Sequence, residues 1–405
     1  MGLCLYIGIL SLCVEGCQGT KMGKHVSVTL GSIEPLAFYD ELNKGKTALI
    51  CEGGGQRGIF TAGVLDEFLK TGFNPFDIMI GTSAGAQNLS AYICGQYGYA
   101  RRVITRYTTS PLFFNPLRFI RGGHLIDLDW LVESTSKEFP LQISSGIELM
   151  EAGREFYMGA SRSDDFEAEF LKPNADTWLD IIRASSAIPG FYRMGVEFEG
   201  TLYHDGGISA AIPVEEAYRQ GADTIVVIRT VPSQMYFTPE WVKRMTRWLE
   251  GEKYGLQRMA TMLKVHLKSY RRTQEFIENP PGDLQIFEIY PPTPLKSSAL
   301  GSRLSALNQD YHVGRRCGRY FIAALGHCFT MNNDAVNRFS FESAAHEEMQ
   351  ILQDYEEAIS DAQNDGELVA QRKAKKATDT AQAIMTGAIV AANEEPAQQI
   401  NEKND

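Results

Sequence analysis

Short apolar runs along the chain alternate with stretches in which apolar residues recur at helical spacing. The runs are typical of buried strands and lie at residues 47–52, 78–80, 155–160, 224–230 and 284–290. The β-branched run at 224–230 is typical of a central strand in a parallel sheet. Helical spacing predicts helices at 59–70, 87–94 and 178–184, one that ends at 220, and one that begins within 125–132. The pattern therefore predicts strands and helices in alternation.

The C-terminal part of the chain shows helical patterns of a different kind. Residues 235–275 carry nine Lys or Arg against four Asp or Glu, and Trp241, Met245 and Trp248 recur at helical spacing. Two interpretations stay open: a basic helix lying on an anionic membrane, or a helix packed on the core with solvated lysines. The remaining predictions are a buried helix at 314–329, an amphipathic helix at 341–359 and, from about 364, a disordered segment or solvated helix.

Length and composition are those of a globular protein with one large domain and appendages. The chain has 405 residues, of which 44% are hydrophobic and 22% charged. The net charge is −11, but residues 342–405 hold 14 acids and 5 bases, so residues 1–341 carry only −2. Nothing in this balance indicates binding to nucleic acid.

Cysteines, histidines and the N-terminal residues bear on location and cofactors. Seven cysteines without a CxxC pair indicate a reducing compartment rather than a disulfide framework or zinc site. The seven histidines lack metal-ligand spacing, so we expect no metal and no cofactor. We interpret residues 1–21 as an upstream extension before Met22; a weak signal-like membrane anchor is the alternative. We expect a cytoplasmic protein, with peripheral contact at the inner membrane face as a further option.

A strand-to-helix junction carries the first candidate catalytic residue. The run at 78–80 ends in Gly81-Thr82-Ser83-Ala84-Gly85, and a helical pattern follows. Gly-x-Ser-x-Gly is typical of a nucleophile elbow, in which a sharp turn exposes the serine hydroxyl and the glycines leave room for the turn. The following helix N-terminus directs backbone amides toward the serine. For this motif alone, an ordinary Gly/Ser turn is an equal alternative.

A glycine-rich loop joins the strand at 47–52 to the helix at 59–70. It reads Gly53-Gly54-Gly55-Gln56-Arg57-Gly58. Backbone amides gathered in such a loop can bind an anion. A Walker P-loop is excluded because it would end in Gly-Lys-Ser/Thr. A dinucleotide site would need an acid at the end of the strand at 78–80, but that strand is followed by Gly81-Thr82-Ser83. We therefore expect an oxyanion hole for the nearby serine.

Two further features are ambiguous from the residues alone. Asp205-Gly206-Gly207 follows Leu202-Tyr203-His204, and by itself it is more typical of a hairpin turn than of a catalytic group. Residues 101–121 hold five arginines and no acid, interleaved with aromatic residues. For this segment we favour solvated arginines over a ligand-facing surface.

Together and in this order, the three motifs resemble the signatures of the patatin-like phospholipase family, most closely its bacterial branch. Residues 184–189 also resemble a loop that this family carries before its aspartate. The resemblance covers residues 45–232 and implies a patatin-like catalytic domain there. We expect an additional α/β and helical region at 233–341 packed on it, and an acidic helical or disordered tail at 342–405. The implied fold is a three-layer α/β/α fold with a mostly parallel central sheet, plus a helical C-terminal extension.

The resemblance also implies acyl-ester hydrolysis of phospholipids or lysophospholipids by a Ser-Asp dyad. Ser83 is then the nucleophile and Asp205 the base. The implied oxyanion hole consists of Gly53, Gly54 and Gly55, with the Ala84 amide as a further donor. The remaining motif residues are Gln56, Arg57, Gly58, Gly81, Thr82, Gly85, Gly206 and Gly207. The expected partners are a lipid ester and, transiently, an anionic membrane surface.

A triad would need a catalytic histidine, and none of the seven lies in a recognisable catalytic sequence. His204 precedes Asp205, but neighbours in an extended chain point to opposite faces. Asp205 can accept the serine proton if burial raises its proton affinity. Arg57 either orients the loop, offsets lipid phosphate charge or forms a structural salt bridge. A weakly active lipid- or acyl-binding regulator and an acyltransferase stay open as alternative functions.

Overall fold

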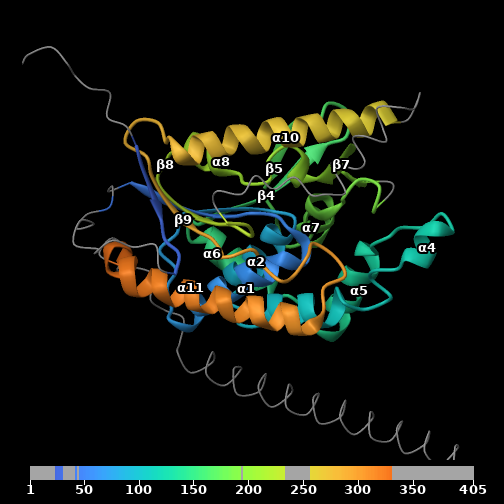
Figure 1. Cartoon of the computed structure of the whole chain (residues 1–405), viewed down its shortest axis with the longest axis horizontal. Coiled ribbons are helices and arrows are strands. Elements are labelled where there is room, and N and C mark those ends of the chain that lie inside the picture. The colour runs from blue at the N-terminus through green and yellow to red at the C-terminus, as the bar shows by residue number, and fades with distance from the viewer. Residues whose placement is uncertain (1–22, 31–41, 43–44, 193–194, 233–255, 331–405) are drawn as a thin grey trace, which may run out of the picture. The chain divides into compact units, whose positions relative to one another are not determined.

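The computed structural model of the chain describes residues 23–30, 42, 45–192, 195–232 and 256–330. Within these residues, nine strands form one sheet in the order β1-β9-β8-β2-β3-β4-β7-β6, with β5 paired to β4 (Figure 1). The strands are β1 (Lys24–Ser27), β2 (Lys46–Cys51), β3 (Ile78–Thr82), β4 (Glu155–Arg162), β5 (Ala168–Leu171), β6 (Val196–Phe198), β7 (Thr201–Asp205), β8 (Ala222–Ile228) and β9 (Gln285–Ile289). Neighbours from β1 across to β4 are parallel. The pairs β4–β5, β4–β7 and β6–β7 are antiparallel.

Helices cover both faces of this sheet. They are α1 (Gly58–Lys70), α2 (Ala84–Ile93), α3 (Tyr99–Arg102), α4 (Pro116–Ile120), α5 (Leu128–Glu138), α6 (Ile143–Glu151), α7 (Trp178–Ser186), α8 (Val214–Arg219), α10 (Leu256–Glu278) and α11 (Leu304–Thr330), with short turns η1 (Gly55–Arg57), η2 (Val103–Tyr107) and η3 (Gly206–Ile208). Figure 1 shows α8 and α10 on one side of the sheet and α1 and α11 on the other. The predicted three-layer α/β/α fold with a mostly parallel sheet is confirmed.

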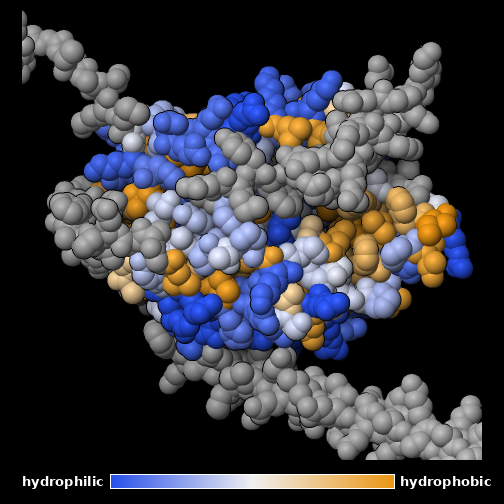
Figure 2. All heavy atoms as spheres, viewed as in Figure 1, coloured by the Kyte–Doolittle hydropathy of each residue, from blue (hydrophilic) through white to orange (hydrophobic). Residues whose placement is uncertain are grey.

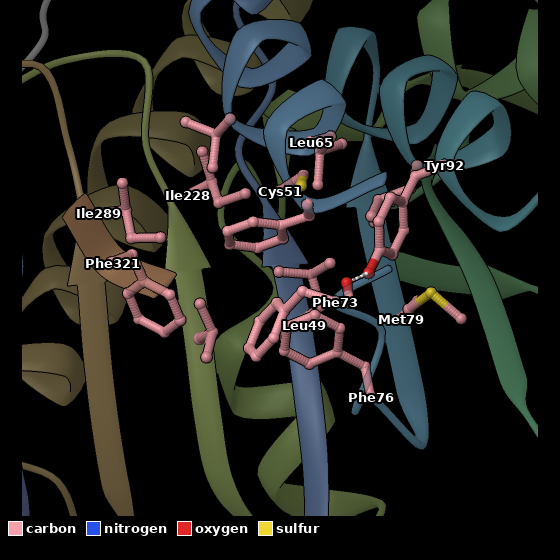
Figure 3. Packing of buried hydrophobic residues seen from close by; sticks show 14 of the residues in the cluster. Leu49, Cys51, Leu65, Phe73, Phe76, Met79, Tyr92, Ile228, Ile289 and Phe321 are labelled. Carbon is pink, nitrogen blue, oxygen red and sulfur yellow. Dashed lines mark hydrogen bonds between the residues drawn. The ribbon is translucent and has the colours of Figure 1, made fainter. Parts of the chain in front are cut away.

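Alternating side chains of the central strands build the two cores between these layers. Along β2, Leu49 and Cys51 pack with α1, α2 and α11, whereas Ala48 and Ile50 pack with α8 and α10. All four are fully buried, as expected for a parallel sheet covered on both faces. Figure 3 shows the first core, where Leu49 and Cys51 lie among aromatic rings such as Phe73. Full burial of a leucine, isoleucine or phenylalanine side chain such as these contributes about 1.5–3 kcal/mol.

The helix predicted at 314–329 is longer than the sequence indicates. It is α11, which begins at Leu304 rather than at residue 314. Gly314 lies inside the helix, where glycine normally lowers stability. A Cβ at this position would lie 2.1 Å from the carbonyl oxygen of Phe60 in α1, and one at Gly63 would lie 2.2 Å from the Tyr311 carbonyl oxygen. Both glycines therefore serve the close contact of α1 with α11, which a pattern along one helix cannot reveal.

Two of the arginines in residues 101–121 stack on aromatic rings, although we expected solvated side chains in this segment. The guanidinium of Arg101 stacks over the ring of Tyr311 at 4.5 Å, and that of Arg102 over Phe139 at 4.3 Å. Arg118 donates a hydrogen bond to the His124 carbonyl oxygen and pairs with Asp127, and these contacts fix the segment around α4. For Arg101 and Arg102 the interpretation is wrong, because aromatic rings distant in sequence contact them, whereas Arg106 and Arg121 are exposed as it expects.

Several predicted elements lie outside the described residues. These are the extension at 1–21, the helical spacing of Trp241, Met245 and Trp248, the helix at 341–359 and the tail beyond it. All the described residues belong to one compact unit of the chain. Among the helices that the structure describes, none combines the length and apolar character needed to cross a bilayer.

Candidate active site

Ser83 lies at the turn between β3 and α2 in a backbone conformation that few side chains adopt. Its φ is 55° and its ψ is −123°, which costs a non-glycine residue on the order of 1–3 kcal/mol. The strand and helix cross closely: a Cβ at Gly81 would lie 2.6 Å from the Gly85 carbonyl carbon. One at Gly85 would lie 2.3 Å from the Cys51 carbonyl oxygen. Neither glycine position has room for a side chain.

Strand register brings Asp205 to the level of Ser83. Thr82 at the end of β3 pairs with Gly159 of the parallel strand β4. The next residue of β4, Ala160, pairs with Asp205 at the end of the antiparallel strand β7. Ser83 and Asp205 therefore flank the same point of β4, although 122 positions separate them in the sequence numbering. This convergence could not be read from the sequence spacing.

The chain does not form a hairpin after Asp205. It turns instead into the 3-10 turn η3, and the Asp205 carboxylate accepts a hydrogen bond from the Gly207 amide at 2.7 Å. Gly206 is confined because a Cβ there would lie 2.2 Å from the Gly159 carbonyl oxygen. The turn thus fixes the carboxylate beside β4, and the hairpin interpretation of this motif is wrong.

Burial sets the protonation of Asp205. Only 7% of the residue is exposed, and desolvation raises the pKa of its carboxyl group from the usual 3.8 to about 6. Hydrogen bonds from the Ser83 side chain and the Gly207 amide act in the opposite direction by stabilising the carboxylate. A carboxylate with this pKa is ionised near neutral pH and can still accept a proton.

The glycine-rich loop after β2 runs directly beside Ser83. A Cβ at Gly53 would lie 3.3 Å from the Ser83 Cβ. The Gly53 amide donates to the Ala211 carbonyl oxygen at 3.2 Å, so it is engaged within the fold. Within the described residues, no hydrogen bond is formed by the amides of Gly54 or Gly55. Gly55 has a φ of 58°, a conformation that favours glycine.

Gln56 fastens this loop to two distant segments. Its amide nitrogen donates to the carbonyl oxygen of Thr108 at 3.1 Å, and its amide oxygen accepts from the Ser302 amide at 2.8 Å. The Gln56 backbone amide donates to the Ala299 carbonyl oxygen at 2.9 Å. Gln56 is buried, and these three hydrogen bonds hold the loop in place.

Residues 184–189, which precede the candidate aspartate in the chain, form hydrogen bonds with the backbone amides of both Ser83 and Asp205. The Ser185 hydroxyl accepts a hydrogen bond from the Ser83 amide at 2.9 Å and donates to the Gly159 carbonyl oxygen at 2.6 Å. The Ala187 carbonyl oxygen accepts from the Asp205 amide at 2.9 Å. Sequence reasoning did not assign these roles, because hydroxyl-to-backbone contacts leave no signature along the chain.

Two cavities meet at Ser83, and both are lined by Gly55, Ile188 and Leu300 as well. The first, here called the α5 cavity, is walled by α2, η2, α5 and α7. Its apolar lining includes Val103, Ile104, Phe113, Leu128, Leu131 and Ile182. An apolar cavity that is lined in part by a serine is suited to hold a hydrocarbon chain.

The second cavity, here called the α10 cavity, is lined by Asp205 and further ionisable side chains. Its lining includes Arg57, and α10 contributes Met262, Leu263, His266 and Tyr270. Burial lowers the pKa of the Arg57 guanidinium, and the charge of Glu52 raises it. A cation is thus available in this cavity, with a carboxylate close by.

A buried network ties α10 to the sheet below this cavity. The Tyr270 hydroxyl donates to the Glu52 carboxylate at 2.8 Å and accepts from Arg229 at 2.8 Å. Arg229 also donates to Glu288 at 2.6 Å. Such a fully buried set of charges is costly to break, typically 3–5 kcal/mol when one partner is removed. The network therefore fixes α10 against β2, β8 and β9.

Two histidines lie near Asp205 but differ in their surroundings. His204 points away, with its Nε2 3.3 Å from the Ser163 hydroxyl, as alternation along β7 predicts. His266 of α10 lines the α10 cavity, and its Nδ1 lies 2.6 Å from the Gly207 carbonyl oxygen. Burial lowers the pKa of the His266 imidazole, so the neutral ring donates from Nδ1. No motif in the sequence selects His266. Within the part of the chain that the structure describes, no group of three His, Cys, Asp or Glu could hold a metal ion.

The fold and these contacts define a class of protein. It is an α/β/α protein whose strand-to-helix turn holds a serine level with a buried carboxyl group, beside a glycine-rich loop and an apolar cavity. Within that class, the chain belongs to the patatin-like phospholipase family, whose sequence pattern matches residues 49–218. A second pattern, a domain of unknown function (DUF6363), matches residues 256–330, which span α10, β9 and α11.

Three known proteins are similar to the chain to different degrees. "Uncharacterized protein YjjU" of Escherichia coli (strain K12) is 62% identical over 309 residues, 76% of this chain and 86% of that protein. "Lysophospholipase NTE1" of Candida albicans (strain SC5314 / ATCC MYA-2876) is 26% identical over 201 residues, 46% of this chain but 13% of that protein. The crystal structure of VipD from Legionella pneumophila, 10% identical, covers 70% of this chain and 67% of its own with a TM-score of 0.32, which supports no structural argument.

Proposed function

We propose that this protein is a serine hydrolase that cleaves acyl esters of lipids, with Ser83 as nucleophile and Asp205 as base. The observation that carries the proposal is the register of β3, β4 and β7, which sets the two residues on either side of one point of β4. The raised pKa of Asp205 supports it, because a serine hydroxyl needs a nearby base. The family supports the reaction class.

The proposed reaction proceeds through an acyl-enzyme. The Ser83 hydroxyl oxygen attacks the ester carbonyl carbon while its proton passes to Asp205. The leaving alcohol takes that proton as the carbon–oxygen bond breaks, and the acyl group stays on Ser83. Water then attacks the acyl-enzyme, gives a proton to Asp205 and releases the fatty acid as the proton returns to Ser83.

Backbone amides would stabilise the negative charge on the ester oxygen during both attacks. We assign this role to Gly54 and Gly55, because the Gly53 amide is engaged with Ala211. The Ala84 amide, at the N-terminus of α2, is a third donor in reach of the turn. Loss of one such donor typically slows turnover about 100- to 1000-fold.

The two cavities suggest how a lipid would be held. The acyl chain would occupy the α5 cavity, which is lined by apolar side chains. The head group would face the α10 cavity, where the Arg57 cation suits a phosphate. Lysophospholipids and phospholipids are therefore the proposed substrates, in agreement with the name of the fungal relative.

Fatty acid release from a lysophospholipid tests this function. The wild type should release fatty acid, and Ser83→Ala and Asp205→Asn should each lose nearly all turnover while remaining folded. None of seven single His→Ala replacements should be as damaging as Asp205→Asn. A histidine variant that matched Asp205→Asn would replace the dyad with a triad. Binding of the lipid without release by the wild type would favour a lipid-binding regulator.

A further inference from the structure

Exposed hydrophobic side chains gather in one short segment around α4. Among the described residues, Leu112 is 58% exposed, Leu117 66% and Ile120 78%. Figure 2 shows hydrophobic residues at the surface of the end of the molecule that carries α4 in Figure 1. We call residues 112–121 the α4 surface. Three such side chains within nine positions are unusual for a surface in contact only with water.

The fold holds these side chains outward. The Arg118 guanidinium donates to the carbonyl oxygens of Leu112 and Phe113 at 2.9 Å each, and it pairs with Asp127 at 3.0 Å. The side chain of Asn115 caps α4 by accepting from the Arg118 amide at 2.9 Å. Hydrogen bonds and an ion pair thus hold the segment in place, and its leucines are exposed even though these contacts are formed.

The charge of the segment favours an anionic partner. The α4 surface holds two arginines, Arg118 and Arg121, and no acidic residue. Arg118 is paired with Asp127, but Arg121 at the end of α4 is exposed and forms no ion pair within the described residues. Apolar side chains beside basic ones match the interface of a bilayer with anionic lipids, where chains and charged head groups lie at neighbouring depths.

The α4 surface also adjoins the candidate active site. Phe113 follows the exposed Leu112 directly, and it lines the α5 cavity that ends at Ser83. Ile126, which lies in the strand-like pairing opposite Phe114, lines the same cavity. A surface in contact with lipid at this place would therefore stand beside the proposed acyl-chain cavity.

We propose that the α4 surface docks the protein reversibly on anionic bilayers, with Leu112, Leu117 and Ile120 inserted among the lipids and Arg121 facing their head groups. The proposal rests on the proposed function for its purpose, because lipid esters reside in such bilayers. Binding to a membrane through this segment does not itself require catalysis.

Vesicle co-sedimentation tests the proposal with the full chain. The wild type should bind vesicles of phosphatidylcholine with phosphatidylglycerol more than vesicles of phosphatidylcholine alone, and less at high salt. Leu112→Ser with Leu117→Ser and Ile120→Ser should lower the bound fraction about tenfold, and Arg121→Glu should remove the preference for anionic vesicles. The matched control is Leu202→Ser with Leu267→Ser, two leucines exposed elsewhere, Leu267 on the basic helix α10.

The outcomes separate this proposal from the proposed function. Turnover of a short, water-soluble ester should be equal in the wild type and the triple variant, whereas turnover of vesicle lipid should fall in the triple variant. Equal vesicle binding by the wild type and the triple variant overturns the proposal, as does a loss confined to the Leu202 and Leu267 control. A dimer in solution that the triple variant dissociates, without vesicle binding by the wild type, assigns the surface to a second copy of the chain instead. Failure of soluble-ester turnover in the wild type counts against the function alone.

Discussion

Replacement of Asp205 by asparagine should stabilise the protein at alkaline pH while it abolishes turnover. The carboxyl group is 7% exposed, and burial raises its pKa from 3.8 to about 6. The folded protein therefore binds the proton more tightly than the unfolded chain does. As the pH rises from about 4 to above 6, the Asp205 carboxyl group loses its proton at lower pH in the unfolded chain than in the folded protein. The free energy of unfolding therefore falls over this range. At pH 8 the full cost of the buried carboxylate is present.

The difference between the two pKa values gives the size of the effect. At about 1.4 kcal/mol per pH unit, it amounts to about 3 kcal/mol at most. Asparagine is uncharged and keeps an oxygen that can accept from the Gly207 amide. Asp205→Asn should thus unfold at a temperature several degrees higher than the wild type at pH 8, and the difference should vanish near pH 4.

Thermal unfolding of both proteins from pH 4 to pH 8 checks this expectation. Asp176→Asn, at an exposed aspartate, is the matched control and should show no such trend. If Asp205→Asn were no more stable than the wild type at pH 8, the carboxyl group would not be desolvated, and its role as a base would lose its physical support. A stabilisation that did not depend on pH would equally contradict the reasoning.

Four further predictions concern pH, residue roles and packing. The kcat/KM of the wild type should rise with pH through an apparent pKa of about 6, as Asp205 ionises; a flat profile from pH 5 to 8 would exclude it as the base. His266→Ala should lower turnover less than about tenfold by freeing the Gly207 carbonyl, and His266→Gln should restore part of it. Leu131→Trp should shift the preference toward shorter acyl chains by filling the α5 cavity, which a series of esters of increasing chain length would reveal. Gly314→Ala should lower the free energy of unfolding by about 1–3 kcal/mol, measured by urea titration, because α1 lies too close.

Local patterns predicted the strands β2, β3, β4, β8 and β9 and several helices, but not the short strands β1, β5, β6 and β7. The run at 47–52 became β2 and the helix at 59–70 became α1, because buried strands and amphipathic helices each leave a period in the sequence. The fold class was predicted through the resemblance of three motifs. The start of α11 was not, since Gly314 marks a contact with α1 rather than a helix boundary.

From the sequence, only those residues of the candidate site that belong to a recognisable motif could be predicted. Ser83, Asp205 and the glycine loop were selected in this way, but their proximity depends on the register of β4. Ser185 and His266 were missed because their contacts join segments far apart in sequence. The contribution of α10 to the second cavity was missed for the same reason.

The most direct test of the central claim is covalent labelling of the wild type with a fluorophosphonate. The reagent's phosphorus bonds to an activated serine oxygen as fluoride leaves, so the label reports both the nucleophile and its surroundings. Peptide mass spectrometry should find one adduct, on Ser83, and no labelling of Ser83→Ala or of unfolded protein. An adduct on a different residue of the folded wild type, or no adduct at all, would contradict the assignment of Ser83 as the nucleophile.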